Sequence, residues 1–314
     1  MADLTSNGWE LNLTWRDHIG DFAYNIGFNI YDNTAKIKKY NNESGLLSDY
    51  YVGQKLGEIW GYVSDGYYTI DDFVLDDAKR DVWTLKEGVT SIQGVKVQPG
   101  DEKFKDFDGD GVISSGAGTV SDPGDRKIIG NNRARFQFGA NIGATYKGFS
   151  LDVRLQGVGK RDYWLSGSSI FPFAGSGSAD AVFQPLFSNQ TDYWTAKSYD
   201  PENSDYMVAK NPNAKLFRIY DQGNNVGSNT RVSDKYLQNA AYLRVKNITL
   251  GYTLPRHWVK HVLMESARIY VSVENLGTIS NLPKGYDPEG NTNNAIVWDY
   301  PYYRTISIGA NITF

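Results

Sequence analysis

Apolar and polar residues alternate strictly between Ala134 and Gly159, which is typical of extended strands. One face of the first segment carries Phe136, Phe138, Ala140, Ile142, Ala144 and Tyr146. After Lys147 and Gly148 the alternation resumes with Phe149, Leu151, Val153 and Leu155. A two-residue turn at Lys147-Gly148 would pair Tyr146 with Phe149, Ala144 with Leu151, and Ile142 with Val153. Each pair joins apolar residues on one face, so turn length and register agree and predict a hairpin.

The same alternation predicts a first hairpin near the start of the chain. Its strands are expected at Gly8–Arg16 and Asp21–Tyr31, with Trp9, Leu11, Leu13 and Trp15 on one face of the first strand. A short turn at Asp17–Gly20 would place Trp15 opposite Phe22. This hairpin therefore resembles the second one in the way it is built.

Three further strands are expected in the last third of the chain. The first is Tyr242–Leu254, whose phase breaks near Lys246-Asn247 and so predicts a bulge. Pro255–Ser266 is a connector with room for one or two helical turns, and a strand from Ala267 to Val273 follows. The last strand, Arg304–Phe314, has Ile306, Ile308, Ala310, Ile312 and Phe314 in alternation. The chain is therefore all-β, with about seven antiparallel strands.

The connections between these strands are alternately short and long. The long ones are residues 33–132, 160–238 and 276–301. Hairpins of this kind put all short turns at one end and all long loops at the other, which is the layout of outer-membrane barrels. Loops of this length count against a compact soluble domain. The alternative is a secreted soluble β-sandwich with large insertions that binds carbohydrate, with a calcium site at Asp106–Asp110.

Composition narrows the function classes. The 32 basic and 36 acidic residues give a net charge of −4, so the chain has no field that would attract nucleic acid. It contains no cysteine, which excludes a disulfide scaffold or a thiolate metal site. No basic region followed by an apolar run marks a signal peptide at the start, and no window has the roughly 18 apolar residues of a membrane helix.

The sharpest chemical motif is an acidic loop with the spacing Asp106-x-Asp108-x-Asp110-Gly111. Clustered oxygen ligands suit a hard cation, and the glycine at the sixth position permits the sharp turn of an EF-hand-like loop. Val112 would contribute its carbonyl. Ala117 stands where the twelfth-position acid is expected, which departs from the EF-hand pattern. We expect a Ca²⁺ site at this loop; the alternative is a solvated Asp/Gly turn.

No motif in the sequence predicts catalysis. His257 and His261 are four residues apart but lack the glutamate of the metalloprotease motif. No spacing brings together a nucleophile, a base and an orienting group, so the chain is not expected to be an enzyme. Aromatic residues of the second loop, Trp164, Tyr193 and Trp194, could stack on sugar rings; alternatively they pack the long loops into an ordered cap.

Several motifs together resemble those of SusC/RagA-like TonB-dependent transporters. They include Asp106–Ile113, Asp125–Gly130, Tyr146–Phe149, Ala241–Pro255, Val273–Leu276 and Gly285–Glu289, and they occur in the expected order. The resemblance spans nearly the whole chain but covers only the end of such a protein. It identifies residues 1–314 as the C-terminal segment of a large transmembrane β-barrel, rather than an independently closed domain.

The resemblance implies a function for the intact protein. It would import glycan or peptide fragments across the outer membrane of a Gram-negative bacterium, driven by the TonB complex through an N-terminal part outside this chain. The expected partners are a SusD-like surface lipoprotein, the barrel-assembly machinery and outer-membrane lipid. The face with Ile308, Ala310, Ile312 and Phe314 is similar to the C-terminal signal that the assembly machinery reads.

The resemblance also implies that the acidic loop closes on Asp125. The expected Ca²⁺ site at the Asp106–Asp125 loop then has as ligands Asp106, Asp108, Asp110, the carbonyl of Val112 and Asp125.

Overall fold

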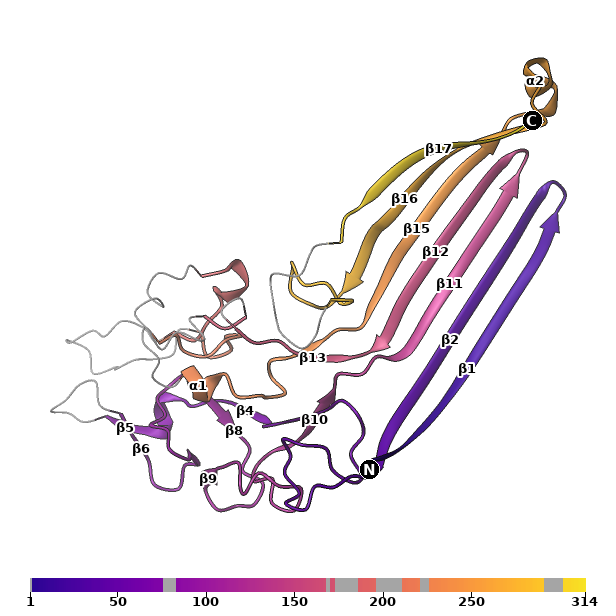
Figure 1. Ribbon diagram of the computed structural model, residues 1–314. Coiled ribbons are helices and arrows are strands. Elements are labelled where there is room, and N and C mark those ends of the chain that lie inside the picture. The colour runs from indigo at the N-terminus through magenta and orange to yellow at the C-terminus, as the bar shows by residue number, and fades with distance from the viewer. Residues whose placement is uncertain are drawn as a thin grey trace, which may run out of the picture.

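A seven-stranded antiparallel sheet dominates the structure (Figure 1). The computed structural model of the chain describes residues 2–75, 83–167, 170–172, 186–195, 211–220, 226–290 and 302–314. The order of the seven strands across the sheet is the same as their order along the chain. The strands are β1 (Asp3–Ile19), β2 (Phe22–Lys39), β11 (Arg135–Tyr146), β12 (Phe149–Lys160), β15 (Tyr242–Thr253), β16 (Ser266–Ser280) and β17 (Thr305–Thr313). The predicted number of strands and their antiparallel arrangement are confirmed.

Short turns join the strands at one end of the sheet. Tyr146 pairs with Phe149, and Lys147 and Gly148 form the predicted two-residue turn, both with positive φ. The predicted first turn is wrong: β1 and β2 continue to Ile19 and Phe22, and Trp15 pairs with Ile26 instead of Phe22. Gly20, with φ of 60°, supplies the positive-φ residue of a two-residue turn, so the strands need not separate earlier.

The third short connection contains the predicted helical turns. α2 (Arg256–Val259) leads into a 3-10 turn, η4 (Lys260–Val262), before β16 begins. This connection lies beside the C-terminus, at the end of the sheet away from the long loops (Figure 1). Among the described residues, no helix is long and apolar enough to cross a membrane.

Rows of paired residues show that the two faces of the sheet differ. One row crosses all seven strands through Trp15, Ile26, Ile142, Val153, Ile248, Val273 and Ile306. The adjacent row, on the other face, is Arg16, Asn25, Gly143, Asp152, Thr249, Ser272 and Ser307. The first face is therefore apolar and the second is polar along the whole width of the sheet.

The apolar face is exposed. Trp15 is 61 % exposed, Leu250 is 53 % exposed and Ile308 is 83 % exposed. A soluble sandwich would bury this face against a second sheet. The buried hydrophobic clusters instead lie in the long loops, away from the sheet. An apolar exterior with a polar interior is the arrangement of a transmembrane barrel wall.

A bulge interrupts β15 where the sequence predicted it. In the pairing with β12, Arg154 faces Asn247 and Leu155 faces Val245, so Lys246 is the extra residue. The pairing with β16 shifts at the same level, between Val245 and Asn247, where β16 has one residue more than β15. The bulge redirects side chains near the long-loop end of the strand.

The described part of the first long loop forms short strand pairs and is not irregular. Its short strand pairs are β3 (Glu58–Gly61) with β10 (Lys127–Asn131), β4 (Ser64–Tyr67) with β8 (Glu102–Phe104), β5 (Phe73–Leu75) with β6 (Trp83–Leu85), and β7 (Ser91–Ile92) with β9 (Val112–Ile113). A 3-10 turn, η1 (Ile70–Asp72), precedes β5. The four strand pairs and η1 surround a buried hydrophobic cluster of Tyr62, Tyr68, Phe73, Trp83, Ile92, Val97, Phe104 and Ile113. Since β2 extends to Lys39, this loop begins later than the sequence suggested.

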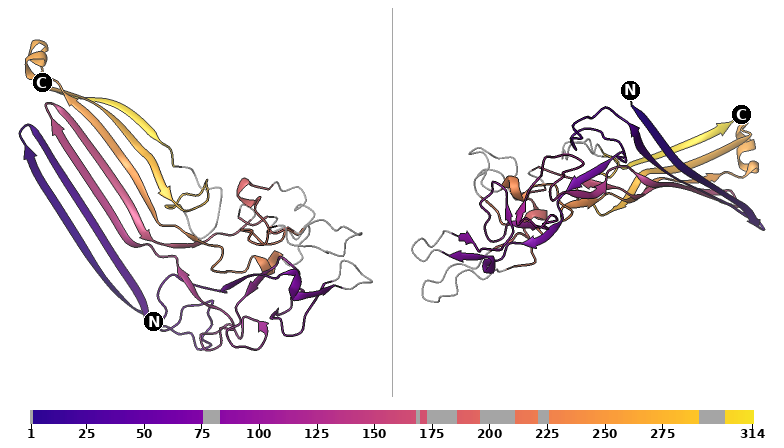
Figure 2. Two further views of the ribbon diagram at one scale, coloured as in Figure 1. Left: turned by 180° about the vertical axis from the view of Figure 1, so that it is seen from behind. Right: turned by 90° about the horizontal axis from the view of Figure 1, so that it is seen from below.

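The second long loop has its own core and joins the first. Its elements are β13 (Asp162–Trp164), η3 (Ser188–Gln190), α1 (Val226–Asn229) and β14 (Leu237–Asn239). The buried cluster includes Tyr163, Phe171, Phe217 and Tyr236. The hydroxyl of Tyr67 in the first loop lies 3.3 Å from that of Tyr236. The two loops therefore form one cap, and two further views show the loops gathered beyond the same end of the sheet (Figure 2).

Candidate functional site

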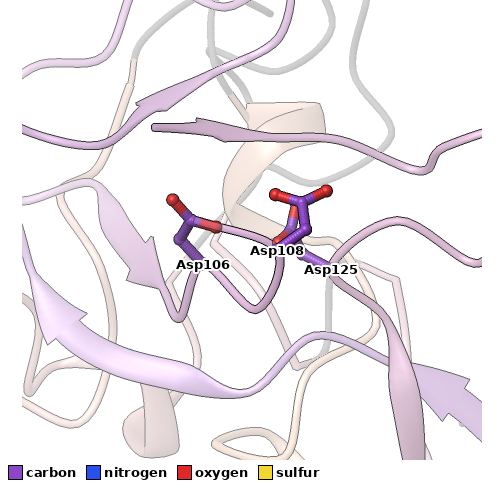
Figure 3. Close-up of side chains that lie close together, drawn as sticks. All are labelled: Asp106, Asp108 and Asp125. Carbon is purple, nitrogen blue, oxygen red and sulfur yellow. The ribbon is translucent and has the colours of Figure 1, made fainter. Parts of the chain in front are cut away.

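Three carboxylates of the predicted metal loop lie together in the cap. One oxygen from each of Asp106, Asp108 and Asp125 lies within 4.8 Å of the other two (Figure 3). Asp106 is half-buried, Asp108 is exposed and Asp125 is fully buried. Residues far apart in sequence thus form the cluster, as the predicted closure on Asp125 requires.

Backbone amides fix two of these carboxylates. Asp106 accepts hydrogen bonds from the amides of Gly109, at 2.6 Å, and Gly111, at 2.8 Å. These bonds hold the pKa of Asp106 below its usual value. Asp125 accepts bonds from the amides of Phe107 and Ser114, both at 2.8 Å, so it ties the two ends of the acidic turn together.

Asp110 has a different role in the turn. Its carboxylate accepts a hydrogen bond from the amide of Val112 at 2.7 Å, and it is not in the three-carboxylate cluster. Val112 begins β9, which pairs with β7. The structure therefore brings together three of the five predicted ligands, and a metal-binding role for all five stays a prediction.

The cluster has the chemistry of a cation site. The amide of Asp110 favours the ionised form of Asp108, but partial desolvation and the charges of Asp110, Asp125 and Asp106 raise the pKa of Asp108. This repulsion is what a bound divalent ion would relieve. The donor set, all carboxylate oxygens, suits a hard ion such as Ca²⁺.

The three predicted ligand-binding aromatics lie in the core of the cap. Trp194 is 4 % exposed, and a side chain at Gly100 would overlap its ring. Trp164 packs against Phe171, with ring centroids 5.8 Å apart, and Tyr193 lies against the same cluster. All three contribute to the order of the cap, and stacking on a sugar by Trp164, Tyr193 or Trp194 stays a prediction.

The C-terminal residues share one face of an edge strand. Ile308, Ala310 and Ile312 lie on the apolar face of β17, and Phe314, next in the alternation, is 82 % exposed. β17 pairs with β16 on one side only in the described sheet. Recognition by the assembly machinery stays a prediction.

A buried ion-pair network joins β15 to the segment Asp287–Glu289, and the sequence pattern does not predict it. Arg244 of β15 is 2 % exposed and lies 2.5 Å from Asp287 and 2.9 Å from Glu289. Lys246, the bulge residue, binds the other oxygen of Glu289 at 2.8 Å. In the sequence, Asp287–Glu289 is recognisable only as part of the Gly285–Glu289 motif. No local spacing indicates that it folds back onto β15.

Glu102, whose carboxyl group is buried, lies where the two loops of the cap meet. Glu102 is fully buried, and its carboxyl oxygens have no hydrogen-bond partner among the described residues. Its amide donates to Asn229 of the second loop at 2.7 Å. Burial raises the pKa of Glu102 to about 8, and the nearby hydroxyls of Ser233 and Ser64 offset this only in part.

The raised pKa of Glu102 predicts a cap that loosens as pH rises. Below the ordinary pKa of 4.5 the group is protonated whether the cap is folded or open. Between 4.5 and about 8 only the open state releases the proton, so stability falls over this interval. At neutral pH, Glu102→Gln should stabilise the cap by up to about 3 kcal/mol. Protease resistance of the cap should fall much less between pH 4.5 and about 8 in this variant than in the wild-type protein. A parallel decline in both proteins would contradict the assignment.

Comparisons with known proteins agree with the fold and the motifs. No protein-family model matches the chain. All of the chain aligns with TonB-dependent receptor P3 of Formosa agariphila, at 26 % identity over 29 % of that protein. It also aligns with TonB-dependent receptor SusC of Bacteroides thetaiotaomicron, at 24 % identity over 27 % of that protein. The chain thus spans less than a third of the length of these relatives.

Solved structures show the same fold. The whole chain superposes on 30 % of a chain in the structure of the RagAB peptide transporter, with a TM-score of 0.61 and 19 % identity. The open-open state of the RagAB peptide importer gives a TM-score of 0.59 and 17 % identity. The resemblance to SusC/RagA-like TonB-dependent transporters is confirmed, and the seven-stranded sheet matches part of such a barrel. These similarities support an outer-membrane location, and relatives that are receptors are consistent with a chain that is not an enzyme.

Proposed function

We propose that this chain forms wall and surface cap of a TonB-dependent outer-membrane transporter that imports glycan or peptide fragments. The observation that carries the proposal is the seven-strand sheet with one exposed apolar face and one polar face. The apolar row, which includes Val153, would face the lipid. The polar row, which includes Asp152, would face the lumen. Similarity to TonB-dependent receptors over the whole chain supports the same function.

The two ends of the sheet would face different compartments. The short turns would lie in the periplasm and the cap of long loops would lie outside the cell. The cap continues directly from the polar wall, because β13 begins two residues after β12 ends. A substrate entering the lumen would therefore pass between the cap and the wall.

The proposed partner on the outside is a SusD-like lipoprotein resting on the cap. Its binding needs an ordered surface, and the two buried clusters supply that order. The TonB complex would act through a part of the protein outside this chain. The alternative, a soluble carbohydrate-binding sandwich, is disfavoured because the apolar face of the sheet is exposed.

The experiment for this function is uptake in living cells. Cells that lack the gene, or that lack TonB, should lose import of a fluorescent oligosaccharide or oligopeptide that wild-type cells accumulate. Restoring the gene should restore import. If no oligomer from either class depends on both genes, the proposed function is wrong.

The acidic loop is proposed to hold Ca²⁺ through Asp106, Asp108 and Asp125. The ion would order the cap rather than take part in chemistry. Without an acid at Ala117, binding is expected to be weak, in the roughly 10⁻⁴–10⁻³ M range. Asp108→Ala or EDTA should increase protease cutting in the first loop but leave barrel assembly intact.

A matched variant separates the metal from the turn itself. Asp110 caps the same turn but lies outside the three-carboxylate cluster. If the three clustered carboxylates alone hold the ion, Asp110→Ala should keep the calcium-dependent protection that Asp108→Ala loses. Equal cutting of the wild-type protein with EDTA and with millimolar calcium would show that the loop is a solvated turn.

A further inference from the structure

A cavity of about 420 Å³ lies between the end of the sheet and the cap. Its lining includes Gln137 of β11, which also lines a second cavity of about 340 Å³ with Asn141 and Arg154. These three residues belong to the polar face of the sheet. The first cavity therefore opens toward the side that the proposed function assigns to the lumen, and the inference below rests on that function.

The side chains that line the first cavity give it a positive charge. Its basic lining residues are Lys55, Arg133, Arg135 and Arg161, and none of its lining residues is acidic. Arg135 is neutralised by Asp32, which accepts hydrogen bonds from its guanidinium. Among the described residues, no ion pair involves the other three. Three cationic groups thus remain available to a ligand.

The backbone around the cavity is fixed in place. Asn131 accepts a hydrogen bond from the amide of Arg133 at 2.8 Å and donates to the carbonyl of Leu56 at 3.0 Å. The amide of Asn132 donates to the carbonyl of Gly57 at 2.8 Å. Gly57 has φ of 85°, and a Cβ there would lie 2.7 Å from Arg133. The Arg133 and Lys55 segments are therefore held side by side before a ligand arrives.

Arg161 is held at the inner side of the cavity. Its Nε donates to the carbonyl of Asn132 at 3.0 Å, its Nη1 donates to the carbonyl of Pro288 at 3.5 Å, and its guanidinium lies over the ring of Tyr163 at 4.5 Å. These contacts orient the group without neutralising it. Burial lowers the pKa of Arg161, which shows that its charge is poorly solvated where it stands. An anion beside it would replace the lost solvation.

We infer that this cavity binds an acidic oligosaccharide, through a uronate carboxylate or a sulfate group held by Lys55, Arg133 and Arg161. Guanidinium groups bind such planar or tetrahedral oxyanions with two hydrogen bonds at once. Carboxamide groups of Asn33, Asn132 and Gln137 also line the cavity and match sugar hydroxyls. No aromatic residue lines it, and Leu56 is its largest apolar residue, so apolar peptide side chains would gain little there.

Calorimetry with the intact transporter tests this assignment. The probes are a galacturonate oligosaccharide, a maltooligosaccharide of the same length and a glutamate-containing peptide of the same charge. The galacturonate oligomer should bind most tightly, and its affinity should fall as salt is added. The Lys55→Gln/Arg133→Gln double variant should weaken that affinity on the order of tenfold or more. The matched control, Arg16→Gln, alters a basic residue of another cavity on the polar face and should leave the affinity unchanged.

Three results would overturn the inference. They are equal affinity for the acidic and neutral oligosaccharides, no effect of the double variant, and binding of the acidic peptide alone. Measuring uptake in cells distinguishes a failure of the acidic-site inference from a failure of the proposed transport function. If neutral oligosaccharides or peptides enter in a TonB-dependent way without any preference for galacturonate, the transport function is supported and the assignment of an acidic-oligosaccharide site is wrong. If no oligomer enters, the transport function itself fails.

Discussion

Val153→Arg is expected to prevent most of the protein from assembling in the outer membrane. Val153 lies in the middle of the apolar row that crosses all seven strands, between Ile142 and Ile248. An arginine at the bilayer midplane of a barrel costs about 2–4 kcal/mol. Heat-modifiable mobility on a gel, together with the amount of protein in the outer membrane, measures the loss.

The matched control places the same side chain on the other face. Gln156 belongs to the same strand, faces the polar side and donates to the hydroxyl of Tyr242 at 3.1 Å. Gln156→Arg removes that one hydrogen bond, which contributes about 1 kcal/mol, and adds no charge to the lipid face. It should assemble nearly as well as the wild-type protein. Equal assembly of both variants would mean that the faces are assigned wrongly.

Arg244→Ala should release the segment around Asp287–Glu289 from the wall. The substitution leaves two half-buried carboxylates without their shared partner. Removing one partner of a buried ion pair costs about 3–5 kcal/mol, and partial exposure of Asp287 favours the lower value. Lys284 is exposed in the same segment. Trypsin cutting after Lys284 should therefore become much faster.

Two comparison variants test the reason for this release. Arg154→Ala removes an exposed arginine from the neighbouring strand and should not change the cutting. In the Arg244→Met background, Asp287→Asn should restore much of the protection, because residue 287 is then neutral and Glu289 keeps Lys246 as its partner. If Arg244→Ala is cut at the wild-type rate, the network does not hold this segment.

The wall of the barrel was readable from the sequence because its signal is local. A period of two places Ile142 and Val153 on one face, and a two-residue turn fixes their pairing. The first hairpin shows the limit of this reasoning. The residues from Asp17 to Ile19 are polar or mixed, so alternation ended at Trp15 although the backbone ladder continues to Ile19.

The cap could not be derived in the same way. Its strands have two to five residues, too few for a periodic signal. Its cores bring together aromatic residues from distant positions, such as Tyr62 with Phe104, whose rings lie 5.0 Å apart. The acidic spacing marks only the Asp106–Asp110 half of the metal loop, and its closure on Asp125 was predicted from the resemblance to the transporter family. The burial of Glu102 and Arg244 and the formation of the basic cavity depend on contacts between distant parts of the chain. No local sequence pattern predicts them.

The central claim is that the apolar face of the sheet contacts lipid and the polar face lines a lumen. Spin labels at successive cysteine substitutions from Ser150 to Leu155 of β12, in the protein reconstituted in lipid, test it most directly. The chain has no cysteine of its own to compete for the label. Collision with oxygen, which concentrates in lipid, should be frequent at Leu151, Val153 and Leu155 and infrequent at Ser150, Asp152 and Arg154. Collision frequencies without this alternation, or access of a water-soluble nickel reagent to Val153, would contradict a transmembrane wall.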